Sequence, residues 1–306
     1  MPPDHPAARS PFMADILFLA PLPDFLAQPL RERHVCHDHS AARDKGELLS
    51  ACGPAIRAVV GAGGTRYEEA ILERLPGVEI ISVFGVGYDG VPLPYCQGRG
   101  IRVTNTPDVL TDDVADIAVA LVLMTSRRLV EANRFLHEGR WAQGQFPLAS
   151  ALRGKTAGIL GLGRIGKAIA RRLEGFGMGI AYHGRSPQAV SYRFCESLAS
   201  LAREADFLIV ACPGGPETTR LVDAGVLDAL GPQGTLINIA RGSIVDEAAL
   251  IRALREGAIA SVGLDVFENE PHVPAELLAR PEVVLLPHVG SGTRETRQAM
   301  GDLAVA

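Results

Sequence analysis

The sequence predicts an α/β protein with two doubly wound domains, each built on a parallel sheet that helices cover on both faces. Three observations support this fold class. Short apolar runs bounded by turn-forming residues alternate with helical patterns along the chain. The length of 306 residues is about twice the ~150 residues of an ordinary domain. A glycine-rich motif between a strand and a helix is typical of dinucleotide-binding sheets.

The amino-terminal part of the chain alternates strands with helices. Each strand is a short apolar run, as in a parallel strand buried on both faces. A long helix begins at Thr111, because Asp112 and Asp113 place acids in its first turn and apolar residues then recur at spacings of three and four. The other predicted elements are the helix Tyr67–Leu75 and the strands Ala14–Pro21, Ile56–Gly61, Glu79–Val83 and Arg102–Thr106.

The second part of the chain repeats this alternation more regularly. Such alternation favours right-handed crossovers and a single parallel sheet. The predicted helices include Arg164–Phe176, Leu221–Leu230 and Glu247–Glu256. The predicted strands are Thr156–Leu160, Gly179–Tyr182, Phe207–Cys212, Thr235–Ile239, Ser261–Val266 and Val283–Pro287.

Composition excludes several classes of function. The chain has 30 Lys and Arg against 35 Asp and Glu, a net charge of −5, so no broad attraction for nucleic acid or acidic membranes is expected. No apolar run approaches the ~20 residues that span a bilayer. The cysteines lack paired spacing, and we expect reduced thiols in a cytoplasmic protein. They are Cys36, Cys52, Cys96, Cys195 and Cys212.

Residues 1–12 are expected to form a flexible tail, with Met13 as the effective start. They are rich in proline and lack the basic and apolar regions of a signal peptide.

A cluster of potential metal ligands follows the first predicted strand. It comprises His34, Cys36, His37 and His39. No partner cluster occurs elsewhere in the sequence, so we interpret these residues as a solvated loop near an edge strand and expect no metal.

A nucleotide-binding motif follows the strand Thr156–Leu160. Gly161, Gly163 and Gly166 form the pattern G-x-G-x-x-G, and a helical segment follows directly. The first glycine makes the turn, the second lets backbone N–H groups approach a pyrophosphate, and the third allows close packing of helix and strand. The helix amino terminus adds the positive end of a dipole. This context predicts a Rossmann cofactor domain; the alternative is a glycine-rich turn without a ligand.

The segment after the next strand predicts the choice of coenzyme. A site selective for NAD normally places Asp or Glu there, to accept a hydrogen bond from the ribose 2′-hydroxyl. This chain has Gly184, Arg185 and Ser186 instead. A guanidinium and a hydroxyl suit a 2′-phosphate, so NADP(H) is the expected coenzyme. The alternative is that Arg185 is an ordinary solvated surface residue.

Three polar residues follow successive strands, at the sheet edge where open α/β sheets bind ligands. They are Arg241, Glu270 and His288. Arg can hold a carboxylate and polarise a ketone, His can deliver a proton, and a neighbouring carboxylate favours the imidazolium. Together they predict 2-oxo acid reduction. Taken separately, Arg241 is a surface cation, Glu270 a loop acid and His288 a satisfied polar residue at a strand end.

Several segments resemble the D-isomer-specific 2-hydroxyacid dehydrogenase family. The resemblance runs from Asp15 to about Leu303. Within that family the chain is most similar to the NADPH-dependent glyoxylate/hydroxypyruvate reductases, including the plant hydroxyphenylpyruvate reductases, with which it shares the GRS segment. The matching segments are Thr104–Asp116, Asn238–Gly242, Gly263–Pro271 and Leu285–Thr293.

The resemblance implies roles for individual residues. Arg241, Glu270 and His288 become the catalytic residues, with His288 as acid/base. The substrate carboxylate is assigned to the amides of Val86 and Gly87 together with Arg241, and accessible amides next to glycine suit an anion. Further implied cofactor contacts are Leu162, Arg164, Ile165, Gly184, Arg185, Ser186, Ile239, Ala240, Arg241 and Asp265, with Asp265 at the nicotinamide carboxamide.

The family also implies a domain arrangement and a homodimer. Residues 1–104 and 289–306 are expected to form a flavodoxin-like substrate-binding domain, and residues 105–288 the dinucleotide-binding domain, with a cleft between them. In dimeric relatives an aromatic residue at the position of Trp141 lies near the other subunit's substrate pocket; the simpler alternative is burial at the dimer contact. Relatives usually continue past the terminal helix, so a shortened returning segment is expected near Ala306.

The predicted reaction is the NADPH-dependent reduction of a small 2-oxo acid of the glyoxylate/hydroxypyruvate class to the D-2-hydroxy acid. Two alternatives stay open. One is an NAD-linked dehydrogenase of the lactate or phosphoglycerate type, which Arg185 and Ser186 disfavour. The other is a nucleotide-sensing, corepressor-like protein without turnover, because fold alone does not fix function. The complete Arg, Glu and His set argues against this second alternative.

Overall fold

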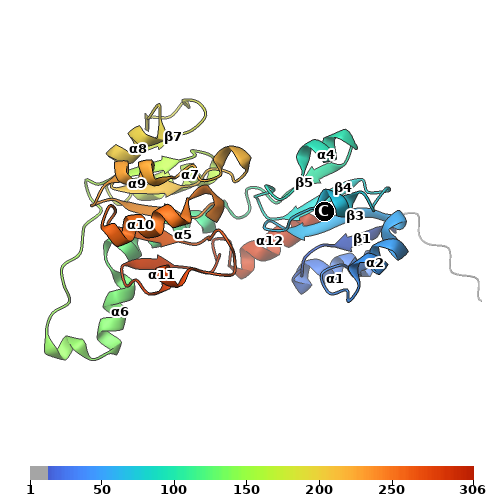
Figure 1. Cartoon of the computed structure of the whole chain (residues 1–306), viewed down its shortest axis with the longest axis horizontal. Coiled ribbons are helices and arrows are strands. Elements are labelled where there is room, and N and C mark those ends of the chain that lie inside the picture. The colour runs from blue at the N-terminus through green and yellow to red at the C-terminus, as the bar shows by residue number, and fades with distance from the viewer. Residues whose placement is uncertain (1–12) are drawn as a thin grey trace, which may run out of the picture. The chain divides into compact units, whose positions relative to one another are not determined.

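Two parallel α/β units make up the described chain (Figure 1). The structure is a computed structural model that describes residues 13–306, so the tail expected over residues 1–12 lies outside the described residues. Unit 1 runs to Leu110 and includes Arg294–Ala306, and unit 2 is Thr111–Thr293. Every strand pairing in both sheets is parallel, which confirms the predicted fold class.

Unit 1 has a five-stranded sheet in the order β2-β1-β3-β4-β5, the order of flavodoxin-like folds. Its core contains Leu17, Val59 and Ile81, each fully buried. The strands are β1 (Asp15–Phe18), β2 (Val35–Asp38), β3 (Ile56–Ala62), β4 (Ile80–Phe84) and β5 (Arg102–Thr104). The helices are α1 (Asp24–Arg33), α2 (Lys45–Cys52), η1 (Gly53–Ala55), α3 (Glu69–Leu72), α4 (Leu93–Gly98) and α12 (Arg294–Val305).

The cluster of histidines and Cys36 is not the loop that the sequence suggests: it occupies the edge strand β2 and its ends. The strand pairs with β1, and His37 Nε2 lies 2.9 Å from Asp15 Oδ2. His34 Nδ1 accepts a hydrogen bond from the amide of Ala14. The short apolar run was too mixed with polar residues to be recognised as a strand. Across residues 13–306, no group of three or more His, Cys, Asp or Glu is placed to hold a metal ion.

The predicted helix Tyr67–Leu75 is shorter in the structure, where α3 spans Glu69–Leu72. The amide of Tyr67 donates to the carbonyl of Gly90 and is therefore not part of a helix. The amide of Leu75 donates to Leu72, a tighter turn that closes the helix before Pro76.

The carboxyl-terminal helix belongs to unit 1, although it follows unit 2 in sequence. α12 packs against α1 and β4. A side chain at Gly301 would place its Cβ 2.8 Å from the Phe25 ring, so the glycine allows the two helices to approach closely.

The two units divide after Leu110 and Thr293, a few residues beyond the expected boundaries at 104 and 288. Hydrogen bonds explain both differences. Asn105 and Thr106 donate to the carbonyls of Val86 and Gly85, which keeps the segment after β5 with unit 1. The amides of Val289 and Gly290 donate to Asp265, which keeps the segment after His288 with unit 2.

Unit 2 has a seven-stranded sheet in the order β12-β11-β10-β9-β6-β7-β8. Counted from β6, this is the Rossmann order with one further strand, and the order reverses between β6 and β9. Ligands bind at the carboxyl edge of such a reversal. The strands are β6 (Thr156–Leu160), β7 (Gly179–His183), β8 (Arg193–Phe194), β9 (Phe207–Val210), β10 (Thr235–Asn238), β11 (Ser261–Leu264) and β12 (Val283–Leu285).

Helices form two layers over this sheet (Figure 1). α5 packs on α7, where Arg172 bonds to Asp112 and Asp116 at 2.9 and 2.6 Å, while α8 and α10 both pack on α9. None of the described helices is long and apolar enough to cross a membrane. The remaining bounds are α5 (Thr111–Ser126), α6 (Leu129–His137), η2 (Arg140–Gln143), α7 (Arg164–Glu174), α8 (Leu198–Glu204), η3 (Pro216–Thr218), α9 (Ala224–Leu230), η4 (Gly242–Ile244), α10 (Glu247–Glu256) and α11 (Ala275–Leu278).

Candidate active site

A hydrogen-bonded imidazole and carboxylate lie at the carboxyl edge of the unit 2 sheet. His288 follows β12 and Glu270 follows β11. His288 Nδ1 lies 2.7 Å from Glu270 Oε2, and the other oxygen, Oε1, accepts the amide of Phe267 at 3.0 Å. Both side chains keep access to solvent, at 43% and 34% exposed. The structure therefore brings together two of the three predicted catalytic residues, with one ring nitrogen of His288 engaged by the carboxylate.

The Glu270 carboxylate is held in its charged form. Its partial burial would raise the pKa, but the hydrogen bond and charge of His288, the Phe267 amide and the charge of Arg241 outweigh burial and lower it. An ionised carboxylate is only an acceptor, so Nδ1 of His288 carries the proton and donates the hydrogen bond to Glu270. This assigns the Nε2 atom of His288 as the nitrogen available to a ligand.

Asp265 fixes the backbone on which His288 is mounted. Its carboxylate accepts the amides of Val289 and Gly290 at 2.7 and 2.8 Å, and its carbonyl accepts the amide of His288 at 2.9 Å. Burial raises the pKa of Asp265, and the two amide bonds and the charge of His288 oppose the rise. His288 has a φ of 53°, a left-handed conformation that these bonds maintain.

Arg241 is placed beside the Glu270 loop by its neighbours in sequence. The Asn238 side chain accepts the amide of Ala240 and donates to the carbonyl of Arg241, so it closes the turn after β10. Gly242 lies against the backbone of Phe267, whose carbonyl carbon would be 1.9 Å from a Cβ at that position. Only glycine permits this approach, and the approach brings the third predicted residue to the same edge of the sheet as the other two.

Asn238 and Gly242 are functional neighbours that the sequence interpretation did not single out. Both lie within the NIARG segment, where the predicted role fell on Arg241. The signal for them was the pattern itself: an amide side chain directly after a strand closes a turn, and a glycine after a charged residue allows close backbone approach.

The glycine-rich loop has room for a ligand at its second glycine. Gly161 has a φ of 96°, and a Cβ there would lie 2.6 Å from Cys212 Cα, at the point where the strand order reverses. A Cβ on Gly166 would lie 2.2 Å from the carbonyl oxygen of Gly161. A Cβ on Gly163 would meet nothing within 4 Å. Packing within the protein therefore requires the first and third glycines, whereas open space at the second fits a pyrophosphate at the start of α7.

The remaining predicted cofactor residues surround this edge. Leu162 is buried in the loop, while Arg164 and Ile165 open α7. Ile239 and Ala240 lie in the turn after β10, next to Arg241. Gly184, Arg185 and Ser186 follow β7, the neighbour of β6, and the Arg185 and Ser186 side chains are exposed. The residues present thus fit a dinucleotide with a phosphorylated ribose.

The predicted carboxylate-binding residues belong to unit 1, at the carboxyl end of β4. The carbonyl of Val86 accepts a hydrogen bond from the Asn105 side chain at 2.8 Å, which ties the segment after β4 to the segment after β5. Gly85 approaches Gly63 closely, because a Cβ on Gly85 would lie 3.1 Å from the Cα of Gly63. Within the described part of the chain, no hydrogen bond has the amide of Val86 or Gly87 as its donor. Two amide donors are thus left for an anion.

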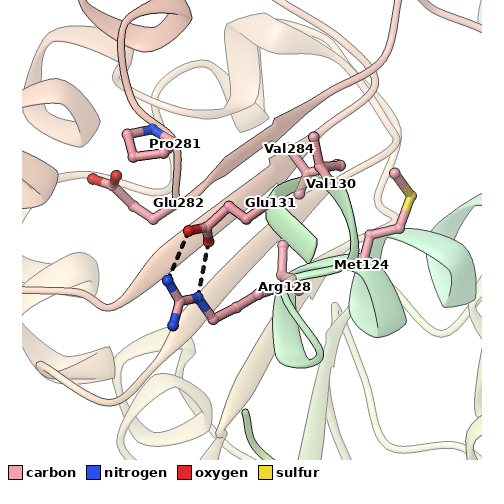
Figure 2. Close-up of a pocket in the computed structure, with 8 residues that line it drawn as sticks. Met124, Arg128, Val130, Glu131, Pro281, Glu282 and Val284 are labelled. Carbon is pink, nitrogen blue, oxygen red and sulfur yellow. Dashed lines mark hydrogen bonds and ion pairs between the residues drawn. The ribbon is translucent and has the colours of Figure 1, made fainter. Parts of the chain in front are cut away.

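Trp141 lies in η2, well away from burial at 67% exposed. It belongs to a segment, Leu129–Ser150, that we call the arm. Arg128 fixes the start of the arm: it pairs with Glu131 at 2.7 and 2.9 Å, as Figure 2 shows, and its guanidinium lies 5.2 Å from the centre of the Phe146 ring. The arm therefore has internal order while exposing apolar side chains.

A small cavity lies beneath the start of the arm (Figure 2). Its volume of about 10 Å³ holds roughly one water molecule, so it is too small for a dinucleotide or a 2-oxo acid. It is lined by Met124, Thr125, Arg128, Val130, Glu131, Pro281, Glu282 and Val284.

Comparisons with known proteins agree with this geometry. Residues 119–290 match the family described as D-isomer specific 2-hydroxyacid dehydrogenase, NAD binding domain. Glyoxylate/hydroxypyruvate reductase A of Arabidopsis thaliana is 48% identical, over 95% of this chain and 93% of its own. Hydroxyphenylpyruvate reductase of Plectranthus scutellarioides is 46% identical over the same shares.

A solved structure is similar throughout. The NADPH-dependent glyoxylate/hydroxypyruvate reductase of Sinorhizobium meliloti, crystallised with NADP and malonate, matches with a TM-score of 0.89 and 46% identity. The match covers 95% of this chain and 91% of that one.

Proposed function

Since this chain belongs to the D-isomer-specific 2-hydroxyacid dehydrogenase family, we propose that it reduces a small 2-oxo acid of the glyoxylate/hydroxypyruvate class to the D-2-hydroxy acid with NADPH. One observation carries the proposal: the His288–Glu270 pair lies at the same sheet edge as Arg241 and the open Gly163 position. A proton donor, a cation and a dinucleotide loop are the parts that ketone reduction requires.

His288 is the proton donor in this proposal. Bound NADPH supplies the hydride to the substrate C2. Glu270 accepts Nδ1–H and so holds the imidazole with Nε2 toward the substrate, where Nε2 gives its proton to the developing alkoxide.

Arg241 and the unit 1 amides hold the substrate in this proposal. The guanidinium of Arg241 binds the carboxylate and polarises the ketone oxygen. The amides of Val86 and Gly87 bind the carboxylate as well, consistent with their lack of an acceptor within residues 13–306.

Trp141 is assigned to the substrate pocket of the other subunit, and Trp141→Ala should raise KM for the 2-oxo acid more than KM for NADPH.

A cytoplasmic homodimer is the proposed state of the protein. The arm supports the dimer, because α6 has no buried residue and Leu136 and Leu148 are 55% and 98% exposed. All five cysteines are free, as predicted, and free thiols are typical of a reducing compartment.

The proposal is tested by following NADPH oxidation with glyoxylate and with hydroxypyruvate. We expect turnover with at least one of them and a higher kcat/KM with NADPH than with NADH. Arg185→Ala should reduce that preference, because it removes the cation assigned to the 2′-phosphate. Coenzyme binding without turnover on either acid would favour the nucleotide-sensing alternative, and a higher kcat/KM with NADH would favour the NAD-linked one.

A further inference from the structure

Gln188 links two loops of the proposed coenzyme site. It follows the segment Gly184–Pro187, which carries the residues assigned to the 2′-phosphate. Its side-chain Nε2 donates to the backbone carbonyl of Leu162 at 2.8 Å. Leu162 lies between the first two glycines of the dinucleotide motif. A single side chain thus connects the loop after β7 to the loop after β6.

The backbone of Gln188 anchors the same segment to its own strand. The amide of Gln188 donates to the hydroxyl of Tyr182 at 2.7 Å. Tyr182 is 1% exposed, and its ring lies 5.4 Å from the ring of Phe194, so the acceptor is held rigidly. The segment Gly184–Pro187 is therefore closed at its end by a buried hydroxyl.

The order of residues 184–187 depends on the contacts at the ends of this segment. Over residues 13–306, no hydrogen bond holds the side chain of Arg185 or Ser186, and both are exposed. A flexible segment loses conformational entropy when it binds a ligand, and a segment that is already ordered loses less.

We propose that Gln188 is a positioning residue for coenzyme selectivity, which holds Arg185 and Ser186 where they bind the 2′-phosphate of NADPH. The inference rests on the proposed function, since it assumes that those two residues bind that phosphate. NADH lacks the 2′-phosphate and gains nothing from their placement. Loss of the Gln188 contacts should therefore weaken NADPH more than NADH.

Two variants test the two contacts separately. Gln188→Ala removes the bond to Leu162, and Tyr182→Phe removes the acceptor of the Gln188 amide while keeping the buried ring. Gln233→Ala is the matched control, because Gln233 is an exposed glutamine in the turn before β10. The Kd of each coenzyme is measured by titration without substrate. For Gln188→Ala we expect the Kd of NADPH to rise about fivefold, as for the loss of one neutral hydrogen bond, and that of NADH to change by less than about twofold.

A second readout needs no coenzyme. Amide hydrogen exchange over Gly184–Gln188 should become faster in Gln188→Ala and in Tyr182→Phe than in the wild type, since each loses an anchor of the segment. Gln233→Ala should leave the exchange unchanged. In steady-state kinetics, the loss in both variants should fall on KM for NADPH rather than on kcat, because neither residue contacts the reacting atoms.

The outcomes separate this inference from the proposed function. Wild-type protein that binds NADPH no more tightly than NADH would contradict the roles of Arg185 and Ser186, and the inference with them. Wild-type selectivity that survives in both variants would overturn the inference alone. Equal weakening of NADPH and NADH would also overturn it, since that result assigns Gln188 to the glycine-rich loop only.

Discussion

At the scale of single residues, the Glu270 carboxylate couples the active site to pH. Its pKa in the folded protein is lowered from the ordinary value of 4.5. The carboxylate therefore stabilises the fold above pH 4.5, and the contribution is lost as the pH falls through the lowered pKa. With 34% of the side chain exposed, solvent screening keeps this contribution small. We expect the wild type to be more stable than Glu270→Gln above that pH, and the two to converge in stronger acid.

Denaturant unfolding between about pH 3 and pH 6 measures this difference. The same variant should lower kcat by at least roughly tenfold, because part of the ~10²–10⁴-fold contribution of general acid catalysis depends on the orientation of His288. A stability difference that widens as the pH falls would contradict the assigned charge of Glu270.

At the scale of elements, substitutions at two glycines should distinguish a loss of stability from a loss of coenzyme binding. Gly242→Ala forces a Cβ into the backbone of Phe267, so we expect a loss of about 1–3 kcal/mol of stability and a lower kcat as Arg241 is displaced. Gly163→Ala meets no protein atom within 4 Å, so stability should change by less than about 0.5 kcal/mol. The Kd of NADPH should nevertheless rise, because the methyl group occupies the space of the pyrophosphate. Denaturant unfolding and coenzyme titration measure both quantities.

Gly144→Ala is the control for both glycine variants, since a Cβ there also meets nothing within 4 Å and the residue, which belongs to the arm, is not among those assigned to the coenzyme or to the packing beside Arg241. It should leave stability and NADPH binding unchanged. Unaltered NADPH binding in Gly163→Ala would contradict the role of that loop.

Local sequence patterns predict some of the helices and strands and miss others. The strand Thr156–Leu160 and the helix starting at Arg164 are as predicted, because apolar runs and a glycine motif are local signals. The edge strand β2 was missed, since two of its four residues, His37 and Asp38, are polar. The break between α5 and α6 was missed too. It depends on Arg128 in a left-handed conformation, and an arginine gives no sign of that conformation in the sequence.

At the scale of the whole molecule, the exposed arm predicts the assembly state. Leu136→Glu combined with Leu148→Glu places charges on apolar surface assigned to the dimer contact, so we expect a dimer for the wild type and a monomer for the double variant by light scattering. Leu278→Glu is the control, because Leu278 is a comparably exposed leucine on α11, outside the arm. A monomeric wild type, or a double variant that stays dimeric, would refute the proposed interface.

At this scale, the sequence predicts only some of the contacts between residues that are distant along the chain. Arg241, Glu270 and His288 were predicted as a set, because parallel strands bring their carboxyl ends to one edge. The contacts of Asn238, Gly242 and Gln188 were not, because each depends on which loops become neighbours after the strands are ordered. Strand order depends on tertiary packing rather than on local patterns.

The general acid role of His288 is tested most directly by His288→Gln, assayed for 2-oxo acid reduction and, separately, for NADPH binding by titration. We predict a fall in kcat of about 10²–10⁴-fold with the Kd of NADPH unchanged, since the imidazole supplies the proton and does not hold the coenzyme. A variant that keeps most of its turnover would contradict the role of His288 as the proton donor.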